Sequence, residues 1–446
     1  MWIAVVAVLH IYTAMYAVGG SILLAYQTGL AYRRSDSGYL EYLRNHTWFF
    51  VLVTLVYSSL LGVGIWWTIG LASPLATEEL IHVFVLGWAM EYVTFILEIV
   101  AAFIFFYYWG RLDPKTHLRI GWIYAGAAFA SLVIITAITA FQLNIGTWKP
   151  DDGFWVAFWN PQALPQIASR LGGSLLLGAL FFFLHSTFKL QSDTRLRDIV
   201  GRESAKWAMV GSVLTIAGGI GWYVNLPATA SAALVGAAVL NVLMFIIFIL
   251  TAATVAMMYY GPIRNPGWLT PGFAILLFAV GHAATGAGEF IREGVRKPYI
   301  VSDRVLGSQV RPQEIPRMRR IGYLNSGVWT KAYIMDRFPQ VIADGKIDNK
   351  MLLALPIKQR REAGRTIFQY HCNDCHAVNG YSAVSQLARG WHRPLTLYTV
   401  KHLDRVHFFM PPWSGTDAEA EVLTDYIESV RHPYPKSLVS TLKEVK

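Results

Sequence analysis

The sequence is poor in cysteine and in charged residues, and both shortages exclude broad classes of protein. Its only two Cys, Cys372 and Cys375, lie three positions apart, so a framework of disulfide bonds is excluded and cofactor attachment is favoured. Only 15% of the 446 residues are charged, whereas 54% are hydrophobic. A soluble fold of this composition would leave too much apolar surface in water, so we expect an integral membrane protein.

The formal net charge of +10 does not indicate a nucleic-acid partner. No basic helix or base-stacking motif accompanies the charge, and Lys and Arg are usual in the loops of membrane proteins. The composition changes near residue 290, because apolar runs precede this point and Arg, Lys, Asp and His are frequent after it. This change predicts the main domain boundary.

Eight segments hold the roughly 20 mostly apolar residues that a helix needs to cross a bilayer. They lie at about 2–27, 47–72, 80–108, 118–143, 164–190, 205–225, 233–260 and 267–290. The first segment has no positively charged start and is too long for the apolar region of a signal peptide, so we expect a retained helix. The predicted fold class is all-α, a polytopic bundle of about eight spans followed by a small helical domain.

The basic residues in the loops predict how the chain crosses the membrane. They are concentrated after the first, third and fifth spans, and the positive-inside rule places these loops in the cytoplasm. They are Arg33, Arg34 and Arg44, then Arg111, Lys115 and Arg119, then Lys189, Arg195, Arg197, Arg202 and Lys206. We therefore expect a multi-pass protein of a bacterial cytoplasmic membrane with both termini and the C-terminal domain on the periplasmic side.

The segment Cys372-Asn373-Asp374-Cys375-His376 is a C-x-x-C-H motif. In such a motif two thiols bind the vinyl groups of one haem covalently, and the adjacent imidazole ligates the iron. A zinc site or a redox pair is the alternative for a bare C-x-x-C pattern. The context favours one covalent haem c, because an amphipathic helix with Gly364-Arg365-Thr366-Ile367-Phe368 precedes the motif.

A second part of the expected haem site follows about 34 residues later, in Phe409-Met410-Pro411-Pro412-Trp413-Ser414-Gly415. The thioether of Met410 is the expected second iron ligand, with His402 and His407 as rivals. A final helix is expected at about 417–431. Together these features resemble a class I cytochrome c over residues 361–432, and we assign 361–446 to this domain. Residues 301–360 are expected to be a basic linker.

Ionisable residues inside membrane spans are costly, so each is a candidate for function. Glu91 and Glu98 are seven residues apart on the third span, on one helix face and about 10 Å from each other. They are candidates for a proton path. Four His are candidates for ligands of membrane haem iron, namely His10, His282, His82 and His185.

Several of these segments resemble subunit I of the cytochrome bd quinol oxidases over residues 1–300. Leu9-His10 with Ala17-Val18-Gly19-Gly20 resembles the opening helix of the family, and Phe95-Ile96-Leu97-Glu98 resembles its Glu-bearing helix. The segment Gly288-Glu289-Phe290-Ile291-Arg292-Glu293-Gly294-Val295-Arg296-Lys297-Pro298-Tyr299 resembles its G-W-x-x-x-E-x-G-R-Q-P-W motif.

The resemblance implies haem b or haem d in the membrane domain, with His10 and Glu293 as iron ligands. It also implies that Arg296, with Lys297, neutralises haem propionates, and that a second membrane subunit similar to subunit II is a partner. Three departures stand out: Ser169-Arg170-Leu171-Gly172 replaces a ligand His of the family, Met90 replaces its earlier Glu, and residues 226–232 replace its long quinol-binding loop.

These features lead to three hypotheses of function. The first is an oxidoreductase subunit, similar to cytochrome bd oxidase, that relays electrons between the c haem and the membrane haems and reduces oxygen. The second is a quinol dehydrogenase that passes electrons outward to other cytochromes c. The third is a haem-poor membrane anchor that carries an electron-shuttling cytochrome c domain.

Overall fold

The computed structural model describes residues 2–380 and 382–432, and the chain forms two compact units. The first, here called the membrane unit, comprises residues up to Leu71 and Thr77–Arg296. The second unit comprises Ala72–Ala76 and the residues from Lys297 onward. Helices dominate both units, which confirms the predicted fold class.

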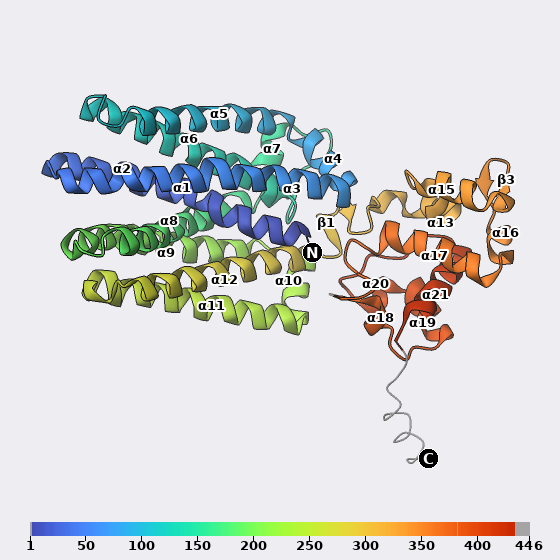
Figure 1. Ribbon diagram of the computed structural model, residues 1–446. Helices are drawn as coiled ribbons and strands as arrows, with labels where there is room; N and C mark the ends of the chain where they lie inside the picture. Colours follow the sequence, from blue (N-terminus) through green and yellow to red (C-terminus); the bar gives the residue numbers. More distant parts are fainter. Residues whose placement is uncertain (1, 381, 433–446) are drawn as a thin grey trace, which may run out of the picture. The chain divides into compact units, whose positions relative to one another are not determined.

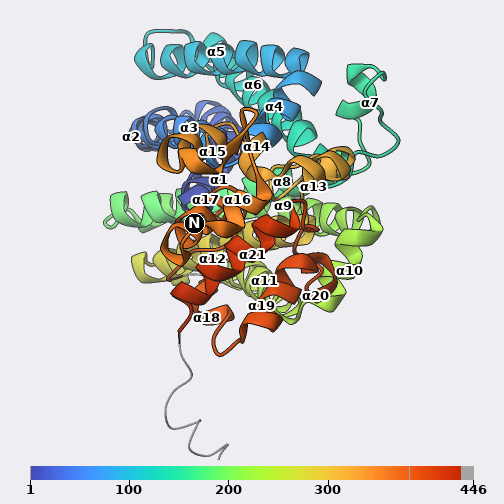
Figure 2. The ribbon, with the colours of Figure 1, turned by 90° about the vertical axis from the view of Figure 1, so that its right-hand side faces the viewer.

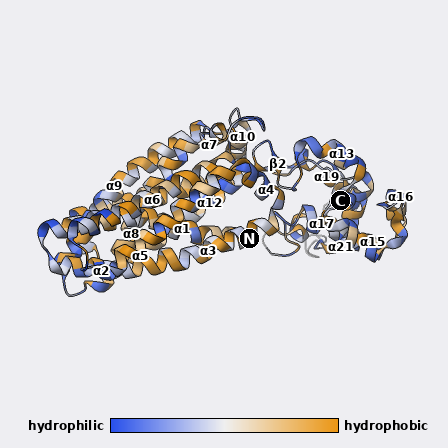
Figure 3. Cartoon of the chain, turned by 90° about the horizontal axis from the view of Figure 1, so that it is seen from above, coloured by the Kyte–Doolittle hydropathy of each residue, from blue (hydrophilic) through white to orange (hydrophobic). Residues whose placement is uncertain are grey.

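The membrane unit contains eight helices that are long and apolar enough to cross a membrane, as the sequence predicted (Figure 1). They are α1 (Trp2–Arg34), α2 (Ser37–Val51) continued by η1 (Leu52–Ser58) and α3 (Ser59–Ala72), α5 (Val85–Tyr107), α6 (Pro114–Phe141), α8 (Ala163–Lys189), α9 (Thr194–Val224), α11 (Ala238–Met258) with η2 (Tyr259–Arg264), and α12 (Pro271–Arg296). Shorter elements connect them, namely α4 (Pro74–Val83), α7 (Phe154–Phe158), α10 (Ala228–Gly236) and η3 (Pro266–Trp268). Hydrophobic residues follow the long helices along most of their length (Figure 3).

The second span begins about ten residues earlier than the sequence predicted. Ser35 has a positive φ of 50° and ends the turn after α1. The carboxylate of Asp36 then accepts a hydrogen bond from the backbone N–H of Tyr39 at 2.9 Å and caps α2. This cap places His46 inside the helix, whereas the predicted span began at residue 47.

Helices α1 and α8 form the middle of the bundle, and α8 packs most extensively against α9 and α1. In two views at right angles, α5 and α11 lie toward opposite edges of the bundle (Figure 2). Glycine allows a close approach between α8 and α9, since a Cβ on Gly172 would lie 2.4 Å from the carbonyl oxygen of Gly211. Small residues commonly provide such close packing between membrane helices.

Two adjacent glycines of α9 test this packing. A Cβ on Gly218 would lie 2.3 Å from the backbone nitrogen of Ser169, whereas a Cβ on Gly219 would meet nothing within 4 Å. We therefore expect Gly218→Ala to lower the free energy of unfolding by about 1–3 kcal/mol. Gly219→Ala is the matched control and should have no effect or raise it by about 1 kcal/mol. Thermal unfolding in detergent measures the difference, and equal effects of the two substitutions would contradict the packing.

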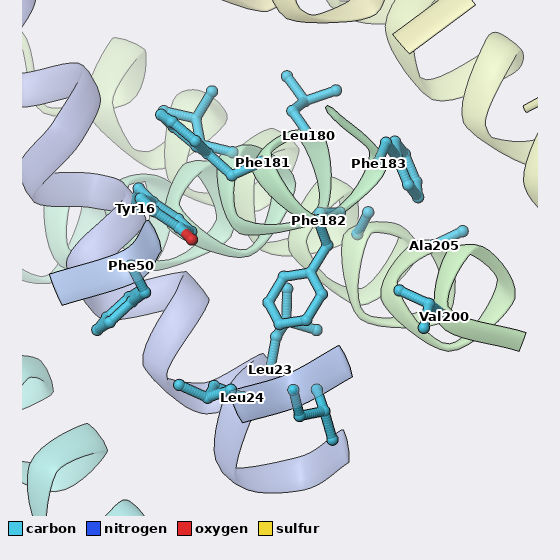
Figure 4. Packing of buried hydrophobic residues seen from close by; sticks show 14 of the residues in the cluster. Tyr16, Leu23, Leu24, Phe50, Leu180, Phe181, Phe182, Phe183, Val200 and Ala205 are labelled. Atoms are coloured by element: carbon cyan, nitrogen blue, oxygen red, sulfur yellow. The ribbon is translucent and has the colours of Figure 1, made fainter. Parts of the chain in front are cut away.

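Aromatic side chains fill the core between α1, α2 and α8 (Figure 4). The rings of Tyr16 and Phe181 are stacked with their centres 3.9 Å apart, and Phe50 packs edge-on against Tyr16 at 5.1 Å. The loops after α1, α5 and α8 lie at one end of the bundle, which is called the basic end because Arg33, Arg34, Arg111 and Lys189 lie there.

The second unit contains short helices and two small hairpins around its own hydrophobic core. Its hairpins are antiparallel, β1 (Tyr299–Val301) with β2 (Val305–Leu306) and β3 (Ile342–Ala343) with β4 (Lys346–Ile347). Its helices are η4 (Pro312–Glu314), α13 (Ile315–Ile321), α14 (Tyr323–Ser326), α15 (Thr330–Arg337), η5 (Pro339–Val341), α16 (Asn349–Ala354), α17 (Ile357–His371), α18 (Val384–Leu387), α19 (Arg393–Lys401), α20 (Leu403–Val406) and α21 (Asp417–Val430).

Residues 301–360, expected to be a basic linker, differ from that description in the structure. They form six complete helices, the last residue of β1 and the strands β2, β3 and β4. Their apolar side chains share one core with the residues that follow. Tyr323 packs edge-on against Trp413 with ring centres 5.0 Å apart, and Glu419 of α21 accepts hydrogen bonds from the backbone N–H groups of Tyr323 and Leu324. The apolar residues of this segment that enter the core are irregularly spaced along the chain, so periodicity did not predict their packing.

Candidate functional site

The C-x-x-C-H motif follows directly after helix α17. The Nδ1–H of His376 donates a hydrogen bond to the backbone carbonyl of Ser382 at 3.1 Å. This bond fixes the orientation of the ring and leaves the lone pair on Nε2 free for a metal, the arrangement that metal-ligating His usually has. Burial lowers the pKa of His376, with the bond to Ser382 opposing the shift, so the ring is kept neutral as a ligand requires.

The two cysteines are not held as a zinc site. In the described part of the chain, no group of three or more His, Cys, Asp or Glu is arranged to hold a metal ion. Burial raises the pKa of the Cys372 thiol to about 12, which disfavours the thiolate that a zinc ligand or a redox nucleophile needs. Covalent attachment of haem therefore stays the predicted role of the two cysteines.

Asp374, between the two cysteines, is a feature that the sequence reading did not single out. Burial raises its pKa to about 7, while Lys297 and a hydrogen bond from Gln309 lower it. Lys297, a predicted partner of haem propionates, therefore lies close to the C-x-x-C-H motif within the second unit. Nothing in the sequence indicated that Lys297 and Asp374 lie close together, because they are 77 positions apart.

Helices α17 and α21 cross closely beside the motif. A Cβ on Gly364 would lie 2.2 Å from the carbonyl oxygen of Val422, so only glycine permits this crossing. Phe368 and Tyr426 pack against each other with ring centres 5.5 Å apart. A cavity of about 410 Å³ lies here, within the usual range for small-molecule sites, and is lined by Arg365, Phe368, Gln369, Asn373, Val378, Tyr426 and Val430.

The candidates for a second iron ligand lie between α19 and α21. Met410 is half-buried, and its backbone N–H donates a hydrogen bond to the carbonyl of His407 at 2.9 Å. His407 is exposed and lies within electrostatic range of His376. His402 is also near the surface, with its Nδ1 bonded to the carbonyl of Tyr398 at 2.9 Å. His407 is thus a stronger rival of Met410 than His402 is.

In the membrane unit, His10 of α1 has the orientation expected of an iron ligand. Its Nδ1–H donates to the carbonyl of Ser58 at 2.9 Å, so Nε2 keeps its lone pair. Ser58 is the last residue of the π-helical turn η1, and such turns are frequent at functional sites. Gly62 makes room for the ring, because a Cβ there would lie 3.1 Å from Cε1 of His10.

His282 of α12 lies close to the same part of α1. Its ring packs edge-on against Tyr12 with centres 4.5 Å apart, and the hydroxyl of Tyr12 donates to the carbonyl of Phe278 at 3.0 Å. Tyr12 is two residues from His10, so the structure brings α1 and α12 together near both candidate ligands.

The other two predicted ligands are His82, which is exposed, and His185, which is buried. His82 is exposed on α4, ahead of the break at Phe84, and its Nδ1 bonds the carbonyl of Glu78 at 2.9 Å. It therefore lies outside the third long helix, at whose start the sequence had placed it. His185 is buried in α8 with its ring 4.8 Å from that of His46, which the sequence reading missed because the predicted second span began one residue later.

Glu91 and Glu98 of α5 lie on one helix face, as their spacing predicted. Ser131 of α6 donates a hydrogen bond to Glu91 at 3.4 Å and also lies near Glu98. Glu98 is buried, whereas Glu91 lines a cavity of about 380 Å³ together with Trp66, Ile81, Val85, Trp88 and Tyr92. The hydroxyl of Ser131 is therefore close to both carboxyl groups.

The last turns of α12 carry a network of ion pairs. Arg292 pairs with Glu289 at 2.7 Å, and Arg296 pairs with Glu293 and also donates to Gln142. The side chain of Glu293 is 47% exposed and that of Arg296 is 6% exposed.

Arg170 of α8 extends this network into the bundle. It donates hydrogen bonds to Thr136 and Thr139 at 3.3 and 3.0 Å and lies within electrostatic range of Glu289. An arginine held by α6 and by α12 therefore takes the position at which the resemblance would have a ligand His.

Comparisons with known proteins concern the sequence and the fold of the chain. Residues 1–222 match the model of the family cytochrome bd terminal oxidase subunit I. The fold is similar to the structure of bd oxidase from Geobacillus thermodenitrificans, with a TM-score of 0.59 and 20% identity over 67% of this chain and 86% of that chain. No curated protein matches the sequence. Residues 1–222 thus resemble the cytochrome bd terminal oxidase subunit I family in sequence, and the eight long apolar helices among the described residues are those of a multi-pass membrane protein.

Proposed function

We propose that the chain relays electrons between a covalent haem c on the second unit and one or more haems of b or d type in the membrane unit, and that it reduces oxygen. Cys372 and Cys375 would hold the haem c, with His376 and Met410 as its ligands. His10 and Glu293 would hold a membrane haem, with His282 as a further candidate ligand. Bound haems would supply electron transfer and, where a coordination position is open, oxygen binding.

The observation that carries this proposal is the common arrangement of His10 and His376. Each ring donates from Nδ1 to a backbone carbonyl, of Ser58 and of Ser382, and so presents Nε2 as a neutral donor atom. The two residues belong to separate units. Each is part of a sequence segment that resembles a haem-binding family. Their protein environments therefore prepare both imidazoles to bind iron.

Oxygen reduction also consumes protons, and Glu91 and Glu98 are placed to deliver them. Both carboxyl groups lie near Ser131, and carboxylates inside membrane helices are expected to serve proton transfer. The basic end of the bundle would face the cytoplasm by the positive-inside rule, which puts the termini and the second unit on the periplasmic side. A second membrane subunit would cover part of the apolar surface of the bundle.

Oxygen uptake by the purified complex tests the proposal. With reduced soluble cytochrome c as the donor, we expect oxygen consumption that Cys372→Ser abolishes, since electrons would enter through the covalent haem. A quinol dehydrogenase would instead reduce cytochrome c when given a quinol and would consume no oxygen. The short α9–α10 connection, Asn225–Pro227, argues against a long quinol-binding loop at this place. Quinol-driven reduction of cytochrome c without oxygen uptake would contradict the proposal.

The sixth ligand of the haem c can be tested separately. A thioether raises the reduction potential of a haem relative to a second imidazole, so Met410→His should lower the potential of the haem c. A redox titration of the purified variant measures this shift. An unchanged potential would assign the ligand to His407 or His402, and His407→Ala would then be expected to change the spectrum.

A further inference from the structure

We propose that Tyr42, His46, His185 and Tyr16 form a proton path from the basic end of the bundle to Glu98. This inference deepens the proposed function, on which it rests, because it assigns the route by which protons reach the carboxyl pair on α5. It is argued from the contacts among α1, α2, α6 and α8. His185 is a haem-ligand candidate from the sequence alone, and the haem sites of the proposed function use none of these four residues.

The path begins near the basic end. His185 lies four residues, about 6 Å of helix, before Lys189 at the end of α8. Its ring contacts those of Tyr42 and His46, with centres 5.4 and 4.8 Å away. His185 is 8% exposed and His46 is fully buried. The three rings therefore lead from the end of the bundle into its interior.

The next step is a direct hydrogen bond. The hydroxyl of Tyr16 lies 3.0 Å from Nε2 of His46. Tyr16 is held in place because its ring stacks on Phe181 (Figure 4). The ring of His46 packs on that of Phe182, with centres 3.8 Å apart. An imidazole can take up a proton on one nitrogen and release one from the other, so His46 returns to its neutral form after each transfer.

From Tyr16 the chain of polar groups continues toward α5. Tyr16 lies within electrostatic range of Tyr124 of α6, and the rings of both pack edge-on against Phe50. Tyr124 in turn lies within electrostatic range of Glu98, and Ser131 lies near both carboxyl groups of α5. Tyr124 therefore links the surroundings of Tyr16 with those of Glu98, and Phe50 packs against both tyrosine rings.

The hydrogen bonding of the imidazoles distinguishes this cluster from a structural one. His117, also buried in this bundle, is bonded at both nitrogens, by Tyr32 at 2.9 Å and by the carbonyl of Phe105 at 2.9 Å. By contrast, Nδ1 of His46 and Nδ1 of His185 are buried without a hydrogen-bond partner in residues 2–380 and 382–432. Buried polar groups without a protein partner usually bind ordered water. Water at these two atoms would connect the rings for proton transfer.

The exchange of the Glu98 carboxyl proton with deuterated solvent tests the path. The C=O band of this group is identified in the infrared spectrum of the purified full chain as the band that Glu98→Gln lacks. A Glu91→Leu background removes the neighbouring carboxyl group, through which exchange from the opposite side would otherwise occur. In this background, Tyr16→Phe should slow the exchange about tenfold or more, because it removes the hydroxyl bonded to His46.

Tyr32→Phe is the matched control. Tyr32 lies on α1, as Tyr16 does, and its hydroxyl is bonded to the buried His117, which is outside the path. The Tyr32→Phe variant should exchange at the background rate, whereas His46→Phe should be as slow as Tyr16→Phe. Equal rates in Tyr16→Phe and Tyr32→Phe, or the lack of a protonated Glu98 band, would overturn the path. The measurement needs neither haem nor turnover, so a chain without membrane haem would overturn the proposed function and leave this result unaffected.

Discussion

Replacing both Cys372 and Cys375 with Ser should abolish covalent attachment of haem to the chain. Each thiol forms one thioether bond in a c-type site, so the double variant would keep only His376, from which haem is lost on denaturation. A haem-stained denaturing gel measures the effect on the 49.9 kDa chain. A zinc site is the weaker alternative for the two cysteines, because no group of three or more His, Cys, Asp or Glu among the described residues is arranged to hold a metal ion. A stained band of undiminished intensity would contradict the assignment.

The second large effect is expected at His10. His10→Ala should remove or convert a membrane haem and leave the haem c intact, because the Nδ1 bond to Ser58 holds the ring as a ligand. The ratio of non-covalent to covalent haem in the purified variant measures this effect. His82→Ala is the control, since His82 bonds a backbone carbonyl in the same way but is exposed on α4. If His82→Ala lowers the ratio and His10→Ala does not, His82 and not His10 is the ligand of the membrane haem.

Glu293→Ala is expected to act like His10→Ala if Glu293 ligates iron. The structure also shows the competing role, because Glu293 pairs with Arg296 and is 47% exposed. A surface ion pair contributes about 1 kcal/mol or less, so its loss alone would leave the haem ratio unchanged. A wild-type ratio in both Glu293→Ala and His10→Ala would contradict the proposed membrane haem site.

The membrane architecture was predictable because the bilayer imposes a length and a polarity on each span. All eight spans were found, and the third and fifth were located within a few residues. The start of the second was missed by ten residues, since it depends on Asp36 as a cap and on the turn at Ser35. His46 was overlooked for the same reason.

The second unit was less predictable than the membrane unit. The C-x-x-C-H motif and helix α21 follow from local sequence, but the packing of residues 301–360 depends on long-range contacts such as that of Tyr323 with Trp413. Similarly, the spacing of Glu91 and Glu98 predicted a shared face, whereas their common partner Ser131 lies on another helix. Contacts between distant segments carry no periodic signal along the chain.

The relay between a covalent haem c and membrane haems is tested by a reduced-minus-oxidised spectrum of the purified chain. The spectrum is recorded before and after extraction of haem with acidified acetone. We expect the spectrum of a haem c to stay with the protein and the solvent to remove haem of b or d type. Covalent haem without extractable haem would make the membrane unit an anchor, and extractable haem alone would remove the c-type site. Either result would contradict the proposed relay between the two units.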